Sequence, residues 1–440
     1  MIKKFLLPIL LTSSFMLSAQ SIQIKYTEYD LPNGLHVILH EDHSTPIVAV
    51  SIMYHVGSKN ENPNRTGFAH FFEHLLFEGS ENIPRGEFAK IVERSGGTLN
   101  ANTSNDRTYY FEIMPSNQLE TSLWLESERL MHAKVDKVGI ETQRSVVKEE
   151  KRQRVDNQPY GTLIEEIMKR MYTNHPYRWM TIGSMEHLDA ASEEDYVNFY
   201  KTFYVPNNAV LSIAGDINVE QTKKLIEKYF GPIPKGTKPI FRPTSGDVPL
   251  TSEIKDTVYD NIQLPAVIEA YRMPSIKDED FYAVRMLGQY LSEGESSKMH
   301  KAIVDEQQKA VFVGAFPYPL EHEGVFITFG IANFGGDPGD LQKSMDEVIF
   351  STQNDLISEN DFTKLRNSIE TEFVSRNATM AGIAETLASA YTYFKNTSLV
   401  NTELDKYMKV TREDIKRVAN QYFNKNKRVV LYYMPKLKKS

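Results

Sequence analysis

The sequence contains no cysteine among its 440 residues. This absence excludes a disulfide framework, a lipid-anchored cysteine and any thiolate ligand for a metal ion. Any zinc would therefore be bound by His, Asp and Glu side chains. A chain of this length can be stable without disulfides, because the buried fraction of the surface rises with chain size.

The sequence also lacks an excess of basic residues and, apart from its start, a long apolar run. The formal net charge is −8, which argues against a protein that neutralises nucleic-acid phosphates. The opening "MIKKFLLPILLTSSFMLSAQ" has a lysine-bearing start, an apolar stretch and then small residues. This pattern predicts a signal peptide over residues 1–20, removed near Ala19 or Gln20, and its apolar part is shorter than the about 20 residues that span a bilayer. We therefore expect an exported protein, periplasmic or secreted, with a retained membrane anchor as the alternative.

Two distant segments of the chain share one layout. "SEEDYVNFYKTFYVPNNAVLSIAGD" begins at Ser192, and "TREDIKRVANQYFNKNKRVVLYYMP" begins at Thr411. Each opens with a Ser or Thr N-cap followed three residues later by Asp195 or Asp414, which is typical of a capping box. A helix, a polar turn and an apolar strand follow in the same order in both segments, which indicates an internal repeat.

The repeat predicts two similar α+β domains, residues 21–235 and 251–440. The segment between them, residues 236–250, belongs to a stretch rich in Pro and Gly and is predicted to be a linker. In the first domain, "GLHVILHEDHS" and "IVAVSIMYHVG" read as strands, and long helical runs follow. Strands and helices in separate blocks favour mainly antiparallel sheets packed with helices over a doubly wound parallel sheet.

The stretch "GFAHFFEHLLFEGS" predicts a helix with Thr66 as N-cap and Gly79 as C-terminal stop. His70 and His74 lie one turn apart, so both imidazoles leave the helix on one side and can reach one zinc ion. Glu73 lies beside this pair, placed to take a proton from a metal-bound water rather than to bind the metal. The order H-x-x-E-H is the reverse of the commoner H-E-x-x-H. The structural alternative is chance, which would produce this string in roughly one chain in fifty.

A catalytic zinc site needs a third protein ligand and an open position for water. The segment "ETQRSVVKEEKRQR" offers Glu150, which on a helix lies on the same side as Val146 and Val147. Glu149 is the competing candidate, and the pattern alone leaves both open. Two His and one Glu around a zinc ion leave a net charge of +1, which suits the ion to acidify water and polarise a carbonyl group.

Three other histidines have a spacing that resembles a metal site. His36 and His40 would lie about 13 Å apart on a strand, too far to share an ion. We therefore expect surface or core roles for His36, His40 and His43.

Several longer motifs accompany the histidine pair, among them "GGTLNANTSNDRTYYF", "VVKEEKRQRVDNQPYG" and "HPYRWMTIGSMEHL". From about residue 25 to its end, the chain resembles the pitrilysin (insulysin) family of inverzincin zinc peptidases, in particular short members similar to mitochondrial processing peptidase subunits. The resemblance implies a zinc endopeptidase with one Zn²⁺ per chain and no metal site in the second domain. It also implies Glu73 as the catalytic base and favours Glu150 over Glu149 as the third ligand.

The segment "GTLNANTSNDRTYY" predicts a strand, a polar turn and a second strand. The resemblance implies that a peptide pairs with this edge by β-augmentation, with Asn100 and Ala101 near the scissile bond. Main-chain pairing recognises extension rather than sequence, so the expected substrates are unfolded peptides or exposed extended segments.

The chain departs from the family pattern in two places. Gln143 stands seven residues before the third ligand, where the family usually has a carboxylate; it can still orient a ligand by hydrogen bonding but adds no charge. Val304 and Val311 stand where complete family sites have an Arg and a Tyr that stabilise the oxyanion. We therefore expect a homologous partner subunit, or a second copy of the chain, to supply that pair. A non-catalytic assembly or peptide-binding subunit is the main alternative, and a zinc hydrolase of non-peptide substrates is a third.

Overall fold

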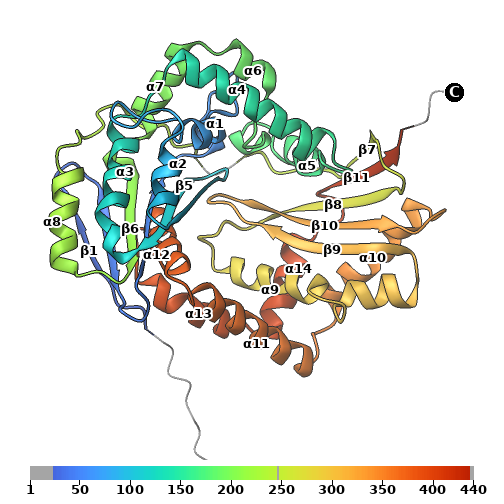
Figure 1. Cartoon of the computed structure of the whole chain (residues 1–440). Coiled ribbons are helices and arrows are strands. Elements are labelled where there is room, and N and C mark those ends of the chain that lie inside the picture. Colours follow the sequence, from blue (N-terminus) through green and yellow to red (C-terminus); the bar gives the residue numbers. More distant parts are fainter. Residues whose placement is uncertain (1–22, 245–246, 437–440) are drawn as a thin grey trace, which may run out of the picture.

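The computed structural model describes residues 23–244 and 247–436, so the expected signal peptide, residues 1–20, lies outside the described residues. Two sheets, each packed with helices, lie side by side (Figure 1). The described part of the chain contains no helix with the length and apolar character needed to cross a membrane. The two sheets packed with helices confirm the α+β fold class predicted from the sequence.

The first sheet has six strands in the order β1-β2-β6-β3-β5-β4. Its neighbours run antiparallel, except that β2 and β6 are parallel. The strands are β1 (Thr27–Asp30), β2 (His36–Glu41), β3 (Ile47–Tyr54), β4 (Thr98–Thr103), β5 (Thr108–Pro115) and β6 (Ala209–Gly215).

The second sheet repeats this arrangement with five strands in the order β7-β11-β8-β10-β9. Here β7 and β11 form the parallel pair, and the other neighbours are antiparallel. The strands are β7 (Ile254–Asp260), β8 (Ala266–Met273), β9 (Ala310–Tyr318), β10 (Gly324–Ala332) and β11 (Arg428–Pro435). From the parallel pair onward the two orders match strand for strand, so β4 and β9 occupy the same edge of their sheets.

The helices also follow a common order in the two halves of the chain. In the first half they are α1 (Phe68–Leu75), α2 (Phe88–Arg94), α3 (Leu119–Met131), α4 (Lys137–Lys151), α5 (Leu163–Met171), α6 (Met185–Ala190), α7 (Glu193–Phe203) and α8 (Val219–Phe230). In the second half they are α9 (Asp280–Ser292), α10 (Pro338–Asn354), α11 (Glu359–Arg376), α12 (Met380–Phe394), α13 (Leu399–Lys409) and α14 (Arg412–Tyr422). Two π-helical turns, η3 (Arg152–Asp156) and η6 (His300–Glu306), interrupt this pattern.

The two repeat segments contain the capping boxes that the sequence predicts. Ser192 accepts a hydrogen bond from the backbone N–H of Asp195 at the start of α7, and the carboxylate of Asp195 accepts one from the backbone of Ser192. Thr411 and Asp414 form the same reciprocal pair at the start of α14. Each helix then leads through a turn into the strand that completes its sheet, β6 or β11.

The two domains exchange one helix each. The second sheet packs on its own helices on one face, whereas its other face packs on α5, through Ile167, Met168 and Met171. Conversely, α12 of the second half packs on the first sheet through side chains that include Ile383 and Leu387. Figure 1 shows α12 beside β6 and α5 beside β11. Because each core contains a helix from the other half, neither domain is complete without its partner.

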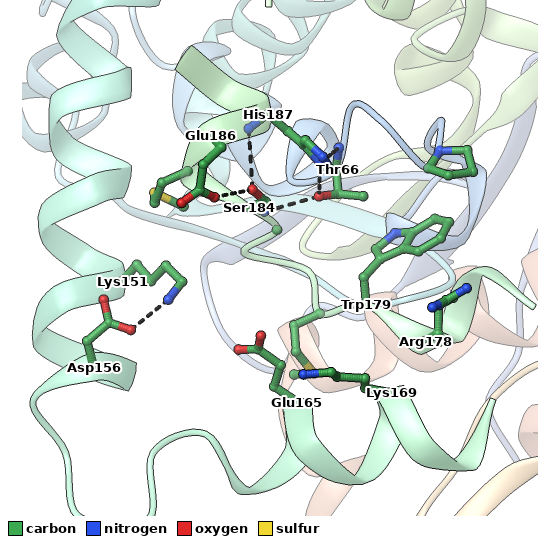
Figure 2. A pocket seen from close by; sticks show the side chains of 14 residues that line it. Thr66, Lys151, Asp156, Glu165, Lys169, Arg178, Trp179, Ser184, Glu186 and His187 are labelled. Carbon is green, nitrogen blue, oxygen red and sulfur yellow. Dashed lines mark hydrogen bonds and ion pairs between the residues drawn. The ribbon is translucent and has the colours of Figure 1, made fainter. Parts of the chain in front are cut away.

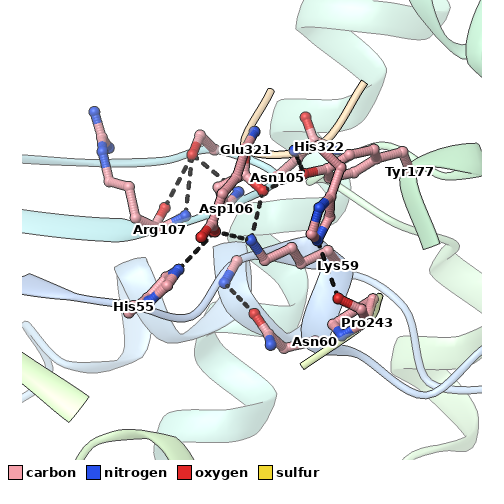
Figure 3. A network of polar contacts seen from close by, with 12 residues as sticks. His55, Lys59, Asn60, Asn105, Asp106, Arg107, Tyr177, Pro243, Glu321 and His322 are labelled. Atoms are coloured by element: carbon pink, nitrogen blue, oxygen red, sulfur yellow. Dashed lines mark hydrogen bonds and ion pairs between the residues drawn. The ribbon is translucent and has the colours of Figure 1, made fainter. Parts of the chain in front are cut away.

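A buried polar network joins the tip of the β4–β5 hairpin to the second domain (Figure 3). The carboxylate of Asp106 accepts hydrogen bonds from Lys59 Nζ at 2.8 Å, from the Tyr177 hydroxyl at 2.5 Å and from the backbone N–H of Glu321 at 3.0 Å. The Tyr318 hydroxyl donates to Asn105 at 2.9 Å. The hairpin that carries β4 is therefore held in place by the second domain.

Lys59 and Glu321 form the charged centre of this network. Lys59 is 1% exposed and contacts both Asp106 and Glu321, while His55 lies 2.7 Å from the Glu321 carboxylate. Burial alone would raise the pKa of Glu321, but the hydrogen bond from His55 and the charge of Lys59 outweigh it and hold that pKa well below its usual range. Glu321 is therefore a carboxylate at neutral pH and pairs with the buried ammonium group.

Candidate metal centre and catalytic site

Helices α1 and α4 pack together and bring the two sequence motifs side by side. Helix α4 begins at an N-cap, Asp136, whose side chain accepts a hydrogen bond from the backbone N–H of Gly139. The prediction that Thr66 caps α1 is wrong. The N-cap is Gly67, which adopts the left-handed conformation (φ 94°), and the orphan N–H groups of Gly67 and Ala69 donate to the buried carboxylate of Glu61.

Glu61 thus performs the capping role from outside the helix. Its two oxygens accept from the first turn of α1 at 2.9 and 2.8 Å, which satisfies donors that would otherwise be unpaired. Burial raises the pKa of Glu61 to about 8, although these backbone bonds oppose that shift. Thr66 instead contacts the imidazole of His187. The helix ends at Leu75, before the expected stop at Gly79.

The structure brings His70, His74 and Glu150 together. The Nε2 atoms of His70 and His74 lie 3.4 and 3.0 Å from Oε2 of Glu150. Within residues 23–244 and 247–436, this is the one group of three or more metal-ligating side chains whose donor atoms all lie within 4.8 Å of one another. Two imidazole nitrogens and one carboxylate oxygen on two packed helices form a donor set suited to zinc.

An orphaned atom supports this fit. Oε2 of Glu150 is buried and accepts no hydrogen bond of good geometry from the described residues. The imidazoles of His70 and His74 beside it hold the pKa of Glu150 well below its ordinary range, so the group is a carboxylate. Glu149, the rival from the sequence, points away and pairs with Arg152 and Gln153 at the surface.

Glu73 lies on the same helix as the two histidines. It is half-buried, and no described residue forms a hydrogen bond or an ion pair with its carboxylate. An unengaged carboxylate beside a metal centre can accept a proton from water and return it to a leaving group.

Gln143 does not bond any of the three clustered residues in the described part of the chain. Its side-chain amide donates to Glu78 at 2.5 Å, and Arg85 pairs with the other oxygen of Glu78. The expectation that Gln143 bonds a metal ligand directly does not match this contact. Instead, Gln143 and Glu78 tie α4 to the segment that follows α1.

Strand β4, which contains Asn100 and Ala101, is one of the two edge strands of the first sheet and lies beside α1. Ala101 packs against the core, whereas Asn100 is exposed and its side chain accepts from the backbone N–H of Ala101 at 2.9 Å. The strand pairs only with β5 among the described strands. Its outer backbone groups are therefore available to an extended peptide.

The remaining predicted residues lie apart from this cluster. His36 is buried against Tyr391, with ring centroids 3.3 Å apart, His40 is buried, and His43 pairs with Asp216 at the surface. Val304 packs against the second core from η6. Val311 is 50% exposed on the edge strand β9.

A cavity of about 610 Å³ opens beside the start of α1 and the end of α4 (Figure 2). Its wall carries charges of both signs, and Lys151 pairs with Asp156 at 2.6 Å on one side. Trp179 forms part of another side and donates its indole N–H to the backbone of Ser58. Other residues that line it are Thr66, Glu165, Lys169, Arg178, Glu186 and His187.

Sequence reasoning missed Glu61 and Arg154. Arg154 Nη1 donates to Oε1 of Glu150 at 2.7 Å. The signal for Arg154 was its position four residues after Glu150, a spacing that pairs side chains on a helix. Glu61 had no local signal, because it reaches the helix from a preceding loop.

Two family models match the chain in succession. Residues 36–184 match the model described as "Insulinase (Peptidase family M16)", and residues 190–369 match the "Peptidase M16 inactive domain". The chain belongs to the M16 (insulinase) family of peptidases. The second model begins just before α7, although β6, which follows that helix, lies in the first sheet.

The sequence similarity to known relatives extends over nearly the full length of this chain. The chain is 29% identical to the zinc protease PqqE of Helicobacter pylori over 97% of both chains, and 25% identical to a probable mitochondrial-processing peptidase subunit beta of Arabidopsis thaliana over 94% of this chain and 78% of that protein. A crystal structure of a protease from Helicobacter pylori matches with a TM-score of 0.89 at 29% identity, covering 93% of this chain and 100% of that one. The periplasmic protease PqqL of Escherichia coli shares the fold, with a TM-score of 0.74 at 18% identity, over 93% of this chain and 47% of its own.

Proposed function

We propose that this protein is a zinc-dependent endopeptidase. The observation that carries the proposal is the cluster of His70, His74 and Glu150, with the unengaged carboxylate of Glu73 on the same helix. The zinc proteases among its relatives support the same reaction class. One Zn²⁺ per chain, held by His70, His74 and Glu150, would supply a Lewis acid that acidifies water and polarises the scissile carbonyl.

The side chains then have distinct tasks. Glu73 accepts a proton from the attacking water and later delivers it to the nitrogen of the leaving amine. Glu150 contributes one negative charge, which balances part of the metal charge. Gln143 and Glu78 hold α4 against the chain that follows α1, so that Glu150 stays opposite the histidines.

The substrates are proposed to be unfolded peptides or exposed extended segments. Such a segment would add to the edge strand β4, with Asn100 and Ala101 near the scissile bond. The free outer edge of β4 beside α1 supports this geometry. The cavity of about 610 Å³ near the same helices offers room for a neighbouring side chain of the peptide.

The chain is proposed to work with a partner. The side chains of Val304 and Val311 cannot donate hydrogen bonds, so they cannot replace the Arg and Tyr that stabilise an oxyanion. A homologous subunit or a second copy of this chain would supply an Arg and a Tyr, as the resemblance implies. The same two valines favour the alternative of a non-catalytic assembly or peptide-binding subunit, whose metal cluster would then be vestigial.

We propose residues 1–20 as a signal peptide and a periplasmic or secreted location for the mature protein. We also propose residues 21–235 as the zinc-binding domain, 236–250 as a linker and 251–440 as the second domain without a metal site. The absence of helices and strands from the described residues between α8 and β7 supports these limits.

The deciding experiment is hydrolysis of a mixed pool of unstructured peptides by the mature, zinc-loaded chain. We expect cleavage that falls by on the order of 10²–10⁴-fold in Glu73→Gln, because this variant loses the proton-transfer group. Glu149→Gln is the matched control, since that exposed side chain faces away from the cluster. Cleavage that survives in Glu73→Gln would refute the mechanism, and zinc binding without any cleavage would favour the partner-dependent or non-catalytic alternatives.

A further inference from the structure

The two oxygens of Glu150 face different groups. Oε2 points at the imidazoles of His70 and His74, whereas Oε1 accepts a hydrogen bond from Arg154 at 2.7 Å. No other described side chain bonds Oε1, and Arg154 forms no other hydrogen bond or ion pair with the described residues. The carboxylate is thus fixed in rotation, with one oxygen toward the cluster and one toward a guanidinium group.

Arg154 lies where the helix type changes. Helix α4 ends at Lys151 and continues as the π-helical turn η3, closed by a hydrogen bond from the backbone N–H of Asn157 to the carbonyl of Arg152. π-helical turns occur frequently at functional sites. In the same stretch, Arg152 pairs with Glu149 on the outer side of the helix. The chain therefore contains two neighbouring Arg–Glu pairs, only one of which reaches the cluster.

We propose that Arg154 is a positioning residue that keeps Glu150 a one-oxygen metal ligand; this inference rests on the proposed metal site. A catalytic zinc site has three protein ligands and a water, and a carboxylate that binds through both oxygens would raise this coordination number from four to five. By engaging Oε1, the guanidinium leaves only Oε2 for the ion. Arg154 thus keeps the site four-coordinate without contacting metal or substrate.

Two opposing effects decide what removal of Arg154 does to metal binding. The positive charge repels a cation, but the side chain is 77% exposed, so water and salt screen this repulsion. The hydrogen bond acts on the ligand itself, and loss of such an outer partner typically costs 10–100-fold in metal affinity. For metal affinity, the hydrogen bond that orients Glu150 therefore outweighs the repulsion between Arg154 and the metal ion. Fold stability should hardly change, because exposed ion pairs contribute little.

The test compares Arg154→Ala and Arg154→Lys with Arg152→Ala in the full mature chain. The measurements are zinc affinity by competition with a chelator and the visible absorption of the Co²⁺-substituted protein, which is intense for four-coordinate and weak for five-coordinate cobalt. We expect Arg154→Ala to bind zinc about tenfold more weakly and to lose cobalt absorption. Arg154→Lys, which keeps one donor and the charge, should recover most of both, and Arg152→Ala should match the wild type.

Identical affinity and cobalt spectra in Arg154→Ala and Arg152→Ala would overturn the inference and leave the metal site intact. A wild-type chain that binds neither zinc nor cobalt at one ion per chain would overturn the proposed metal site and this inference together. Thermal unfolding of each variant separates these outcomes from simple misfolding, and Arg154→Lys provides the second test if the alanine variant is unstable.

Discussion

The corresponding helix pairs of the two domains use the same spacing for different chemistry. In the first domain, two residues four apart on α1, His70 and His74, face Glu150 of α4. In the second domain, two residues four apart on α9, Arg285 and Gln289, both donate to Glu372 of α11. One arrangement leaves a carboxylate oxygen without a hydrogen bond, and the other satisfies both oxygens.

This difference shows what separates a metal centre from a structural contact on one scaffold. A guanidinium group and the NH₂ of a side-chain amide both donate hydrogen bonds, so they satisfy a carboxylate and hold two helices together. An imidazole nitrogen can offer a lone pair, so a pair of histidines opposite a carboxylate can bind a cation between them. The fold supplies the helix pair in both domains, and the side chains decide its use.

The largest expected difference concerns zinc content. Glu150→Ala should lower zinc affinity by more than roughly a hundredfold, because a ligand rather than an outer partner is lost. Glu372→Ala, the corresponding change in the second domain, should leave one zinc per chain and cost only about 1 kcal/mol of stability, since that ion pair is partly exposed. Metal analysis after dialysis measures both. Equal zinc loss in the two variants would break the comparison.

The next effect concerns the contact between the domains. Lys59→Met leaves Asp106 and Glu321 without their shared buried cation, which should lower the free energy of unfolding by about 3–5 kcal/mol. Urea unfolding at neutral pH provides the measurement. Lys223→Met, at a surface pair with Glu220, is the control and should change stability by less than about 1 kcal/mol.

Acid should weaken the same contact. The pKa of Glu321 is depressed in the folded protein, so its contribution is fully present above the unfolded value of about 4.3 and is lost as pH falls toward the folded value. The wild-type free energy of unfolding should therefore decrease below about pH 4. Glu321→Gln cannot titrate and should show a flatter pH profile. Parallel profiles for the two proteins would contradict this assignment.

The smallest effect comes from the repeated caps. Ser192→Ala and Thr411→Ala each remove the oxygen that accepts from the third backbone N–H of a helix, and each should cost about 1 kcal/mol. Similar losses in the two domains would support their equivalence, measured by thermal unfolding. If only one of the two variants lost stability, the two caps would contribute differently to the free energy of unfolding.

Local features of the fold could be predicted from the sequence because neighbours in the chain determine them. The capping boxes at Ser192 and Thr411 and the strands that follow their helices depend on short-range patterns, and both are present. The spacing of His70 and His74 likewise placed both side chains on one face of α1. The helix ends were less accurate, since a residue outside the helix, Glu61, satisfies its first turn.

Long-range contacts could not be predicted in this way. An amphipathic helix shows that it has an apolar face but not which sheet covers it, so nothing in α5 or α12 indicated the exchange. The pair Lys59–Glu321 joins residues far apart in the chain. Helical spacing pairs both Arg152 with Glu149 and Arg154 with Glu150, but it does not show which pair reaches the histidines.

The helix exchange has a consequence for biosynthesis. The first sheet receives its last strand at β6, yet one of its faces stays uncovered until α12, which ends at Phe394, has left the ribosome. If the sheet forms in that interval, apolar side chains that pack under α12 in the folded protein, such as Ile38 and Met53, lack their cover. The nascent chain therefore needs a delay in folding or a chaperone, and a product truncated before α12 would be a target for aggregation or degradation.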